Sequence, residues 1–182
     1  SLVMEGSEQS LIDATKIHMT KIRASTFQMG CTKEQILDCD IDERPVHKVL
    51  LNRNFLIGTY EVTQGLYERI MGDNPSFFSS CGARCPVENV SWYEAIAFTN
   101  ALNDSLGLQR CYTFTSHQEI SFVGITCRGY RLPTESEWEY VARANQDFMF
   151  SGGQEIDLLA WYINNSFSQT HPVGQKVGNR LG

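Results

Sequence analysis

The chain has 182 residues, of which 42% are hydrophobic and 11% aromatic, and this is enough apolar material for a packed core. Such a composition excludes a disordered or low-complexity chain. The 15 Lys and Arg residues are outnumbered by 21 Asp and Glu residues, and the formal net charge of -6 argues against nucleic acid as a partner, because nucleic-acid binding needs a basic face.

The beginning of the chain predicts a flexible tail that leads into a single domain. Residues 1–15 are polar and show no hydrophobic period, whereas residues 16–182 contain no internal repeat and no change in composition that would mark a linker. No apolar run approaches the roughly 20 residues that a membrane-spanning helix needs. We therefore expect one domain over residues 16–182, without a membrane span.

The first part of this domain predicts strands. Apolar residues are interspersed with polar ones from Ile17 onwards, and the segment ends at Gly30, which predicts a first strand that closes on a glycine turn. A polar, acidic loop is expected over residues 31–44. Two further apolar runs, over residues 46–51 and 55–58, predict the next strands.

Three segments then predict helices. Each begins with a Ser or Thr that can cap a helix, and in two of them a Glu follows three residues later, which completes a capping box. Apolar residues continue at helical spacing in all three. The predicted helices begin at Thr63, Ser91 and Thr134, and the first two end at Gly72 and Gly107.

Between the second and third helices lies a segment bounded by cysteines. Its two short β-type runs, residues 112–115 and 121–126, predict a hairpin or two irregular strands. After Ala144 the chain is rich in Gly, Asn and Ser, which predicts loops.

Six cysteines lie in pairs of near neighbours, and this spacing favours three disulfides formed in an oxidising compartment, hence a secreted or periplasmic protein. Zinc is the rival interpretation, but a structural zinc site needs four Cys or His ligands and only one pair is tightly spaced. Free thiols are the third alternative. The preferred local disulfides join Cys31 to Cys39, Cys81 to Cys85 and Cys111 to Cys127, whereas six cysteines formally allow 15 pairings and the sequence leaves the connectivity open.

An acidic run resembles part of a calcium loop. Asp38, Asp40 and Asp42 occupy the first three ligand positions of such a loop, but Glu43 and Val49 stand where it needs Gly and Glu. We interpret the run as a solvated acidic loop, with weak calcium binding as the alternative.

Other site motifs give little support for an enzyme. The four histidines lie singly, without the spacing of a metal site, and the sequence lacks a nucleophile elbow, a phosphate-binding loop and a dinucleotide-binding glycine motif. The tryptophans are more often core anchors than ligand platforms, and we expect them in or near the core. They are Trp92, Trp138 and Trp161.

Seven short segments occur in a specific order along the chain. They read TFQMG at 26–30, DERPVHKV at 42–49, FLIGTYEVTQ at 55–64, NPSFF at 74–78, PVENVSWYEA at 86–95, YRLPTESEWEYVAR at 130–143 and HPVG at 171–174. In this order they resemble the formylglycine-generating enzyme family, also called the sulfatase-modifying factor domain. The resemblance covers nearly all of residues 16–182 and implies an α+β, C-type-lectin-like fold, with short antiparallel strands, three flanking helices and much irregular loop.

The resemblance also implies what chemistry to look for. Active members of the family bind copper(I) through a pair of cysteines and oxidise a sulfatase cysteine to formylglycine. That pair follows a Gly-Asn-x-Trp-Glu-Trp segment in the C-terminal half of the domain, and none of the six cysteines aligns with it. The resemblance also implies calcium ligands in the loop over residues 162–170, but this loop contains Asn164 and Asn165 and no carboxylate.

We therefore expect residues 16–182 to be the N-terminal portion of such a domain, with no catalytic, cofactor-binding or metal-binding residues of its own and with apolar surface and strand edges exposed. Thr134, Glu137 and Trp138 are expected to be scaffold. Whether the whole protein is an enzyme stays open at this point. The alternative function is a non-catalytic C-type-lectin-like module that binds a ligand or a protein; sulfur–carbon bond formation on non-haem iron is a weaker third alternative.

Overall fold

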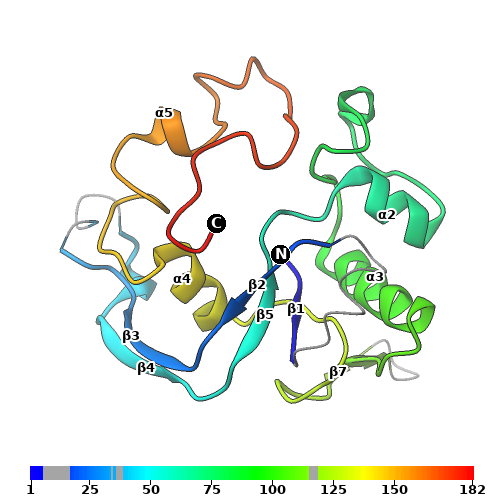
Figure 1. The fold of residues 1–182 in the computed structure, drawn as a ribbon, viewed down its shortest axis with the longest axis horizontal. Helices are drawn as coiled ribbons and strands as arrows, with labels where there is room; N and C mark the ends of the chain where they lie inside the picture. Colours follow the sequence, from blue (N-terminus) through cyan, green and yellow to red (C-terminus); the bar gives the residue numbers. More distant parts are fainter. Residues whose placement is uncertain (6–16, 34, 36–38, 115–118) are drawn as a thin grey trace.

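The computed structural model describes residues 1–5, 17–33, 35, 39–114 and 119–182. Short antiparallel strands form the centre, helices flank them on both sides, and long loops make up one end of the molecule (Figure 1). The predicted α+β architecture is therefore confirmed. In the part of the chain that the structure describes, no helix is long and apolar enough to cross a bilayer.

Three small sheets build the centre. The first has the strand order β1-β5-β2, the second pairs β3 with β4, and the third is the hairpin β6-β7. Their bounds are β1 (Val3–Met4), β2 (Met19–Ile22), β3 (Ser25–Met29), β4 (His47–Leu51), β5 (Phe55–Gly58), β6 (Tyr112–Phe114) and β7 (Ile120–Phe122). The hairpin is one of the two outcomes that the sequence predicts for the segment between the second and third helices.

The expected tail over residues 1–15 is wrong for its first five residues. Val3 pairs with Ile57 and Met4 with Leu56, so β1 is an edge strand of the first sheet, and both residues are buried. A strand of two residues carries no periodic pattern, and only its pairing with β5 and with Arg131 makes it a strand. Residues 6–15 of the expected tail lie outside the described residues.

The expected first strand is in fact two strands that belong to different sheets. β2 pairs with β5 and β3 pairs with β4. Between them the backbone N–H of Ala24 donates to Oδ1 of Asn54 at 2.8 Å, a contact over 30 residues that the local pattern does not reveal. The glycine turn is confirmed: Gly30 has φ +104, and a Cβ there would lie 2.4 Å from the carbonyl oxygen of Glu43.

The three predicted helix starts are confirmed at the capping residue. Thr63 precedes α2 (Gln64–Met71), Ser91 precedes α3 (Trp92–Ser105) and Thr134 precedes α4 (Glu135–Arg143). The last two have complete capping boxes. α2 ends at the predicted Gly72, and α3 ends at Ser105, two residues before Gly107. Among the residues that the structure describes, the other helices are single turns that the sequence did not predict: η1 (Ile41–Glu43), η2 (Ser79–Cys81) and α5 (Ile156–Leu159).

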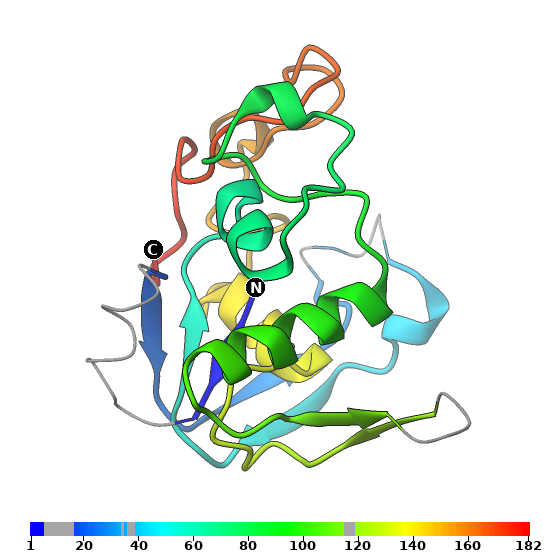
Figure 2. The ribbon, with the colours of Figure 1, turned by 90° about the vertical axis from the view of Figure 1, so that its right-hand side faces the viewer.

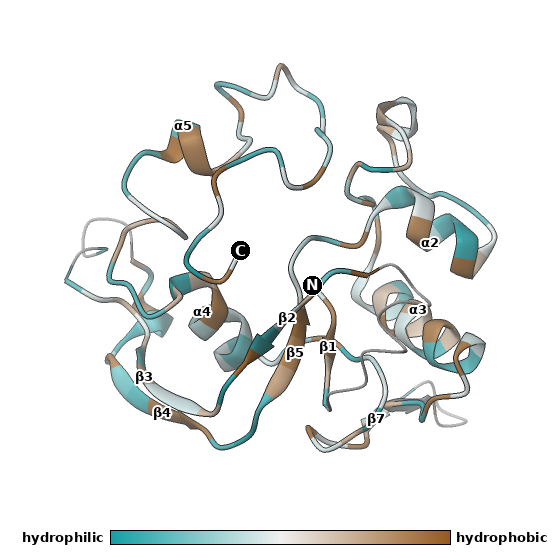
Figure 3. Ribbon diagram, viewed as in Figure 1, coloured by the Kyte–Doolittle hydropathy of each residue, from teal (hydrophilic) through white to brown (hydrophobic). Residues whose placement is uncertain are grey.

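The helices pack on the sheets through two apolar clusters. On one side Leu2 and Met4 pack with residues of α2 and α3, where the rings of Tyr67 and Phe98 stack at 5.2 Å between centroids. On the other side the ring of Phe27 in β3 meets the ring of Tyr140 in α4 edge-on, with 5.3 Å between the ring centroids. The hydrophobic residues of the sheets therefore pack against helices in both clusters, and β5, whose four residues are all buried, is strongly hydrophobic along its length (Figure 3).

A buried ion pair ties α4 to the segment before it. Both guanidinium nitrogens Nη1 and Nη2 of Arg131 donate to Glu137 at 2.7 Å. Glu137 also accepts from the backbone N–H of Thr134 at 2.8 Å, which is one half of the capping box. Thr134 and Glu137 are thus part of the scaffold, as expected.

The expectation that the tryptophans anchor the core is wrong. Trp92, Trp138 and Trp161 are 56%, 57% and 39% exposed. Trp92 is the first residue of α3, and the buried residues of that helix begin only at Ile96. In α4 the buried position is taken by Glu137, and the next residue along a helix points about 100° away from it.

Candidate binding site

The six cysteines form three separate disulfides with no free thiol. Cys31 pairs with Cys39, Cys81 with Cys85, and Cys111 with Cys127, and these are the neighbour pairs that the spacing favours. The first closes the loop after β3, the second lies beside α2, and the third joins the two ends of the hairpin β6-β7. The sulfur atoms therefore do not converge on a common centre.

The acidic run is not a built metal site in the part of the chain that the structure describes. Asp40 caps η1, and its backbone N–H donates to Oε1 of Glu43 at 3.3 Å. Asp38 lies outside the described residues. Elsewhere among residues that are described, no three His, Cys, Asp or Glu side chains group together in a way that could hold a metal ion.

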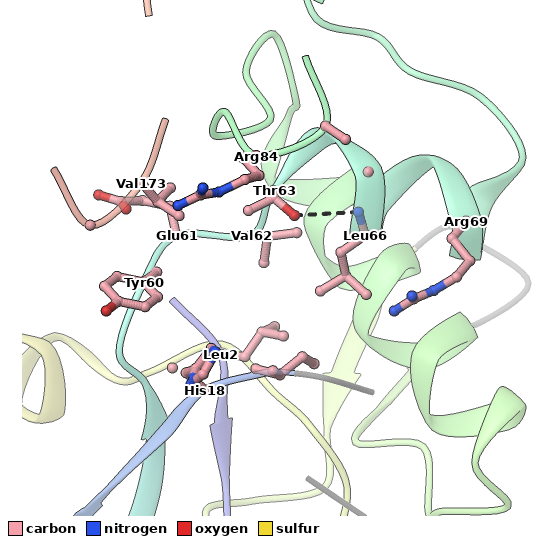
Figure 4. A pocket seen from close by; sticks show the side chains of 15 residues that line it. Leu2, His18, Tyr60, Glu61, Val62, Thr63, Leu66, Arg69, Arg84 and Val173 are labelled. Carbon is pink, nitrogen blue, oxygen red and sulfur yellow. Dashed lines mark hydrogen bonds between the residues drawn. The ribbon is translucent and has the colours of Figure 1, made fainter. Parts of the chain in front are cut away.

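Two adjoining clefts lie at the loop-rich end of the fold. The first has a volume of about 650 Å³ and lies between the end of β5, the start of α2 and the segment around Val173 (Figure 4). The second, of about 460 Å³, is lined mainly by residues 159–163 and 169–176. Glu61, Val173 and Gly174 line both clefts, so the two spaces meet there.

One wall of the first cleft is the start of α2, locked to the disulfide loop beside it. The backbone N–H of Gln64 donates to Cys85 O at 2.8 Å, and that of Gly65 donates to Ala83 O at 3.0 Å. A Cβ at position 65 would come within 2.8 Å of the Cβ of Ala83, so the close approach requires glycine here. The buried Gln64 side chain also donates to the carbonyl oxygen of Phe78.

The opposite wall is the segment that follows His171. The backbone N–H of Val173 donates to Arg84 O at 3.0 Å, which joins the two walls at one end of the cleft. Gly174 has φ +72, and a Cβ there would lie 2.9 Å from the ring of Tyr60. The Tyr60 ring in turn meets the His18 ring edge-on at 5.9 Å.

The first cleft is apolar at its base and mostly cationic around it. Leu2, Val62 and Leu66 contribute apolar side chains. Figure 4 shows the guanidinium groups of Arg69 and Arg84 on either side of Leu66. Sequence reasoning did not find these residues as a site, because no local motif joins them.

Trp161 and its neighbours shape the second cleft. The ring of His171 stacks on Trp161 at 3.9 Å between centroids, and Nζ of Lys176 lies 3.9 Å from the centre of the same ring. The hydroxyl of Tyr162 donates to Asp157 at 2.8 Å, and this hydrogen bond raises the pKa of Tyr162. The loop is thus held by its own polar contacts and leaves apolar side chains outside.

Four of the exposed apolar side chains stand around this end of the molecule, and we call them the apolar rim: Phe77, Trp161, Ile163 and Phe167. Phe77 is 80% exposed, and Ile163 and Phe167 are each 84% exposed. Their loops lie side by side at the top of Figure 2, where Sγ of Cys81 is 3.2 Å from the carbonyl oxygen of Thr170. Sequence reasoning expected apolar surface but did not place it here.

Comparison with known proteins identifies relatives of the whole domain. The family described as the sulfatase-modifying factor enzyme 1-like domain matches residues 9–182. Chaperone protein LppX of Paenibacillus barcinonensis is 37% identical over an alignment of 162 residues, and the match covers 71% of this chain. This chain spans little more than half of that relative, because the matched part covers 57% of its length.

Solved structures share the fold. Treponema denticola variable protein 1 is 35% identical, with a TM-score of 0.78, and the match covers 90% of this chain and 67% of that one. CarF and PvdO from Pseudomonas aeruginosa are 23% and 22% identical, with TM-scores of 0.66 and 0.64. Those matches cover 92% and 90% of this chain and 75% and 64% of theirs. By sequence and by its C-type-lectin-like fold, this chain belongs to the sulfatase-modifying factor enzyme 1-like family.

Proposed function

We propose that this chain is a non-catalytic protein-binding module, which holds an apolar segment of another protein against the apolar rim in an oxidising compartment outside the cytoplasm. The observation that carries the proposal is the rim itself, in which Ile163 and Phe167 are both 84% exposed and Ile163 lines the second cleft. The rim residues stand on loops that lie side by side (Figure 2), and large exposed apolar side chains gathered at one end of a folded domain mark sites of interaction.

The loops that carry the rim are pre-ordered, which favours binding. The Cys81–Cys85 disulfide and the backbone hydrogen bond from Val173 to Arg84 connect the two loop segments. A surface that is ordered before binding loses less conformational entropy when the partner arrives. A relative that is 37% identical is named a chaperone, which is consistent with binding to other polypeptides.

The second candidate is oxidation of a sulfatase cysteine by the whole protein, and the family description favours it. In that reaction copper(I) would be held by two thiolates, since soft sulfur ligands suit this ion. All six cysteines of this chain are paired with one another in disulfides, and none is left as a thiol. This candidate is therefore supported by the family membership but not by a residue of this chain.

We expect thiol titration of the unfolded, non-reduced protein to detect no free thiol, because all six cysteines are paired. The measurement uses a thiol-reactive dye in denaturant, before and after reduction, and reduction should release six reactive groups. Six reactive groups before reduction would contradict both the disulfides and the oxidising compartment.

Polar substitution of the rim should weaken protein binding. We expect the wild-type chain to suppress the light scattering of heat-unfolded citrate synthase in the absence of reductant, and the double variant Ile163→Ser/Phe167→Ser to need about tenfold more protein for the same effect. Burying a large apolar side chain contributes roughly 1.5–3 kcal/mol. Both side chains are exposed in a loop, so the variant should keep the fold.

The matched control is Ile41→Ser, which removes an isoleucine that is 89% exposed in η1, away from the rim. It should suppress scattering as well as the wild type does. Equal loss in the control and the double variant, or no suppression by the wild-type chain, would refute the proposed function. Tight binding of one equivalent of copper(I) in a thiol-free titration would favour the oxidase instead.

A further inference from the structure

We propose that the first cleft binds a carboxylate joined to an apolar group, with Arg84 as the residue that recognises the carboxylate. The inference goes beyond the proposed function, because it concerns the cleft beside α2 and not the apolar rim. It rests on the charge of the lining, the setting of Arg84 and the apolar base of the cleft.

The charge around the cleft runs against that of the whole protein. The chain has a formal net charge of -6, yet the cleft is lined by two arginines, Arg69 and Arg84, and by one carboxylate, Glu61. The positive charge of Arg84 can attract an anionic ligand to this cleft although the chain as a whole is acidic.

Arg84 stands on a rigid part of the backbone. Its carbonyl oxygen accepts from Val173, its neighbour Ala83 accepts from Gly65, and its other neighbour Cys85 is tied to Cys81. Within the described part of the chain, the Arg84 guanidinium makes no hydrogen bond and no ion pair with another side chain. The Arg84 side chain is exposed, and its guanidinium has free N–H groups that can bind a carboxylate through two parallel hydrogen bonds.

The space beside Arg84 suits an apolar body. Leu2, Val62 and Leu66 lie between the two arginines and Tyr60 (Figure 4). A volume of about 650 Å³ is in the range of clefts that hold small ligands, which combine an apolar lining with a few placed polar groups. The C-terminal residue of a peptide and a free apolar acid both present this chemistry.

The test compares two probes that differ only in the carboxylate. Isothermal titration calorimetry would measure binding of N-acetyl-Ala-Leu with a free C-terminus and of the same dipeptide as its amide, each to the 182-residue chain. We expect the acid to bind about tenfold more tightly than the amide. Arg84→Gln should reduce this preference to less than about twofold, because a neutral amide side chain cannot replace a guanidinium.

The matched control is Arg23→Gln, an exposed arginine that lines neither cleft, and it should keep the full preference for the acid. Decanoate as a third probe separates the two sources: decanoate binding that Arg84→Gln abolishes, without binding of the dipeptide, assigns the cleft to free acids. Equal affinity for acid and amide, absence of binding by all three probes, or an unchanged preference in Arg84→Gln would overturn the proposal. The Ile163→Ser/Phe167→Ser variant should keep acid binding, so failure of either proposal is seen separately.

Discussion

Replacing Glu137 by alanine is expected to lower the free energy of unfolding by about 3–5 kcal/mol, the cost of leaving a buried charge without its partner. Arg131 is fully buried and both of its terminal nitrogens donate to Glu137. The variant would also remove the acceptor for the backbone N–H of Thr134, the residue that caps the N-terminus of α4. Urea denaturation followed by circular dichroism would measure the loss.

The control for this experiment is Asp104→Asn, which breaks an ion pair of similar geometry on the surface. Asp104 and Arg110 keep 46% and 61% of their side-chain surface exposed, so solvent screens the pair and the midpoint of unfolding should hardly change. If Glu137→Ala lowered stability no more than Asp104→Asn, the buried pair would not hold α4 in place as we infer.

The same pair predicts the response to acid. Burial alone would raise the pKa of Glu137, but hydrogen bonds from Arg131 and Thr134 outweigh it, and the pKa lies below its ordinary value. A carboxyl group with a lowered folded-state pKa stabilises the fold above its unfolded-state pKa, near 4.5, and this contribution disappears as the pH falls through the folded-state pKa. The difference in the free energy of unfolding between wild type and Glu137→Ala should therefore shrink as the pH falls from the unfolded-state pKa towards and through the folded-state pKa of Glu137.

Removing the third disulfide with Cys111→Ala/Cys127→Ala should lower the free energy of unfolding by about 3 kcal/mol, the chain-entropy value for a loop of this length. The disulfide spans 16 residues, and both cysteines are buried beside Ile96 and Tyr112. Loss of the two sulfur atoms would leave a small cavity in that cluster, which adds to the effect. Thermal and urea denaturation without reductant would measure it.

The comparison variant is Cys31→Ala/Cys39→Ala, which opens a disulfide that spans only 8 residues. Its loop is shorter and Cys39 is only partly buried, so the expected loss is smaller than that of the buried pair. A larger loss in this variant than in Cys111→Ala/Cys127→Ala would show that burial and loop length do not determine the order of the two effects.

The secondary structure that the sequence predicted well is the part that depends on neighbouring residues. Thr63, Ser91 and Thr134 cap their helices through contacts only three residues away, so the pattern is visible locally. The strands and their partners were harder to predict from the sequence. β1 exists because Val3 pairs with Ile57, and the break between β2 and β3 depends on which partner each strand has. Such pairing is decided over tens of residues, and no window of sequence contains it.

By itself the sequence determined the family, the class of fold, the helix starts and the neighbour pairs of cysteines, because each of these depends on residues that are close together or on short motifs that follow one another in order along this chain. Only the tertiary structure decided where the tryptophans lie and which side chains meet in a cleft. Arg84 and Val173 are 89 residues apart in the sequence. They are joined by a backbone hydrogen bond that no sequence pattern in either segment predicts. Long-range contacts of this kind arise from the packing of the whole chain, and for that reason the candidate site could be seen only in three dimensions.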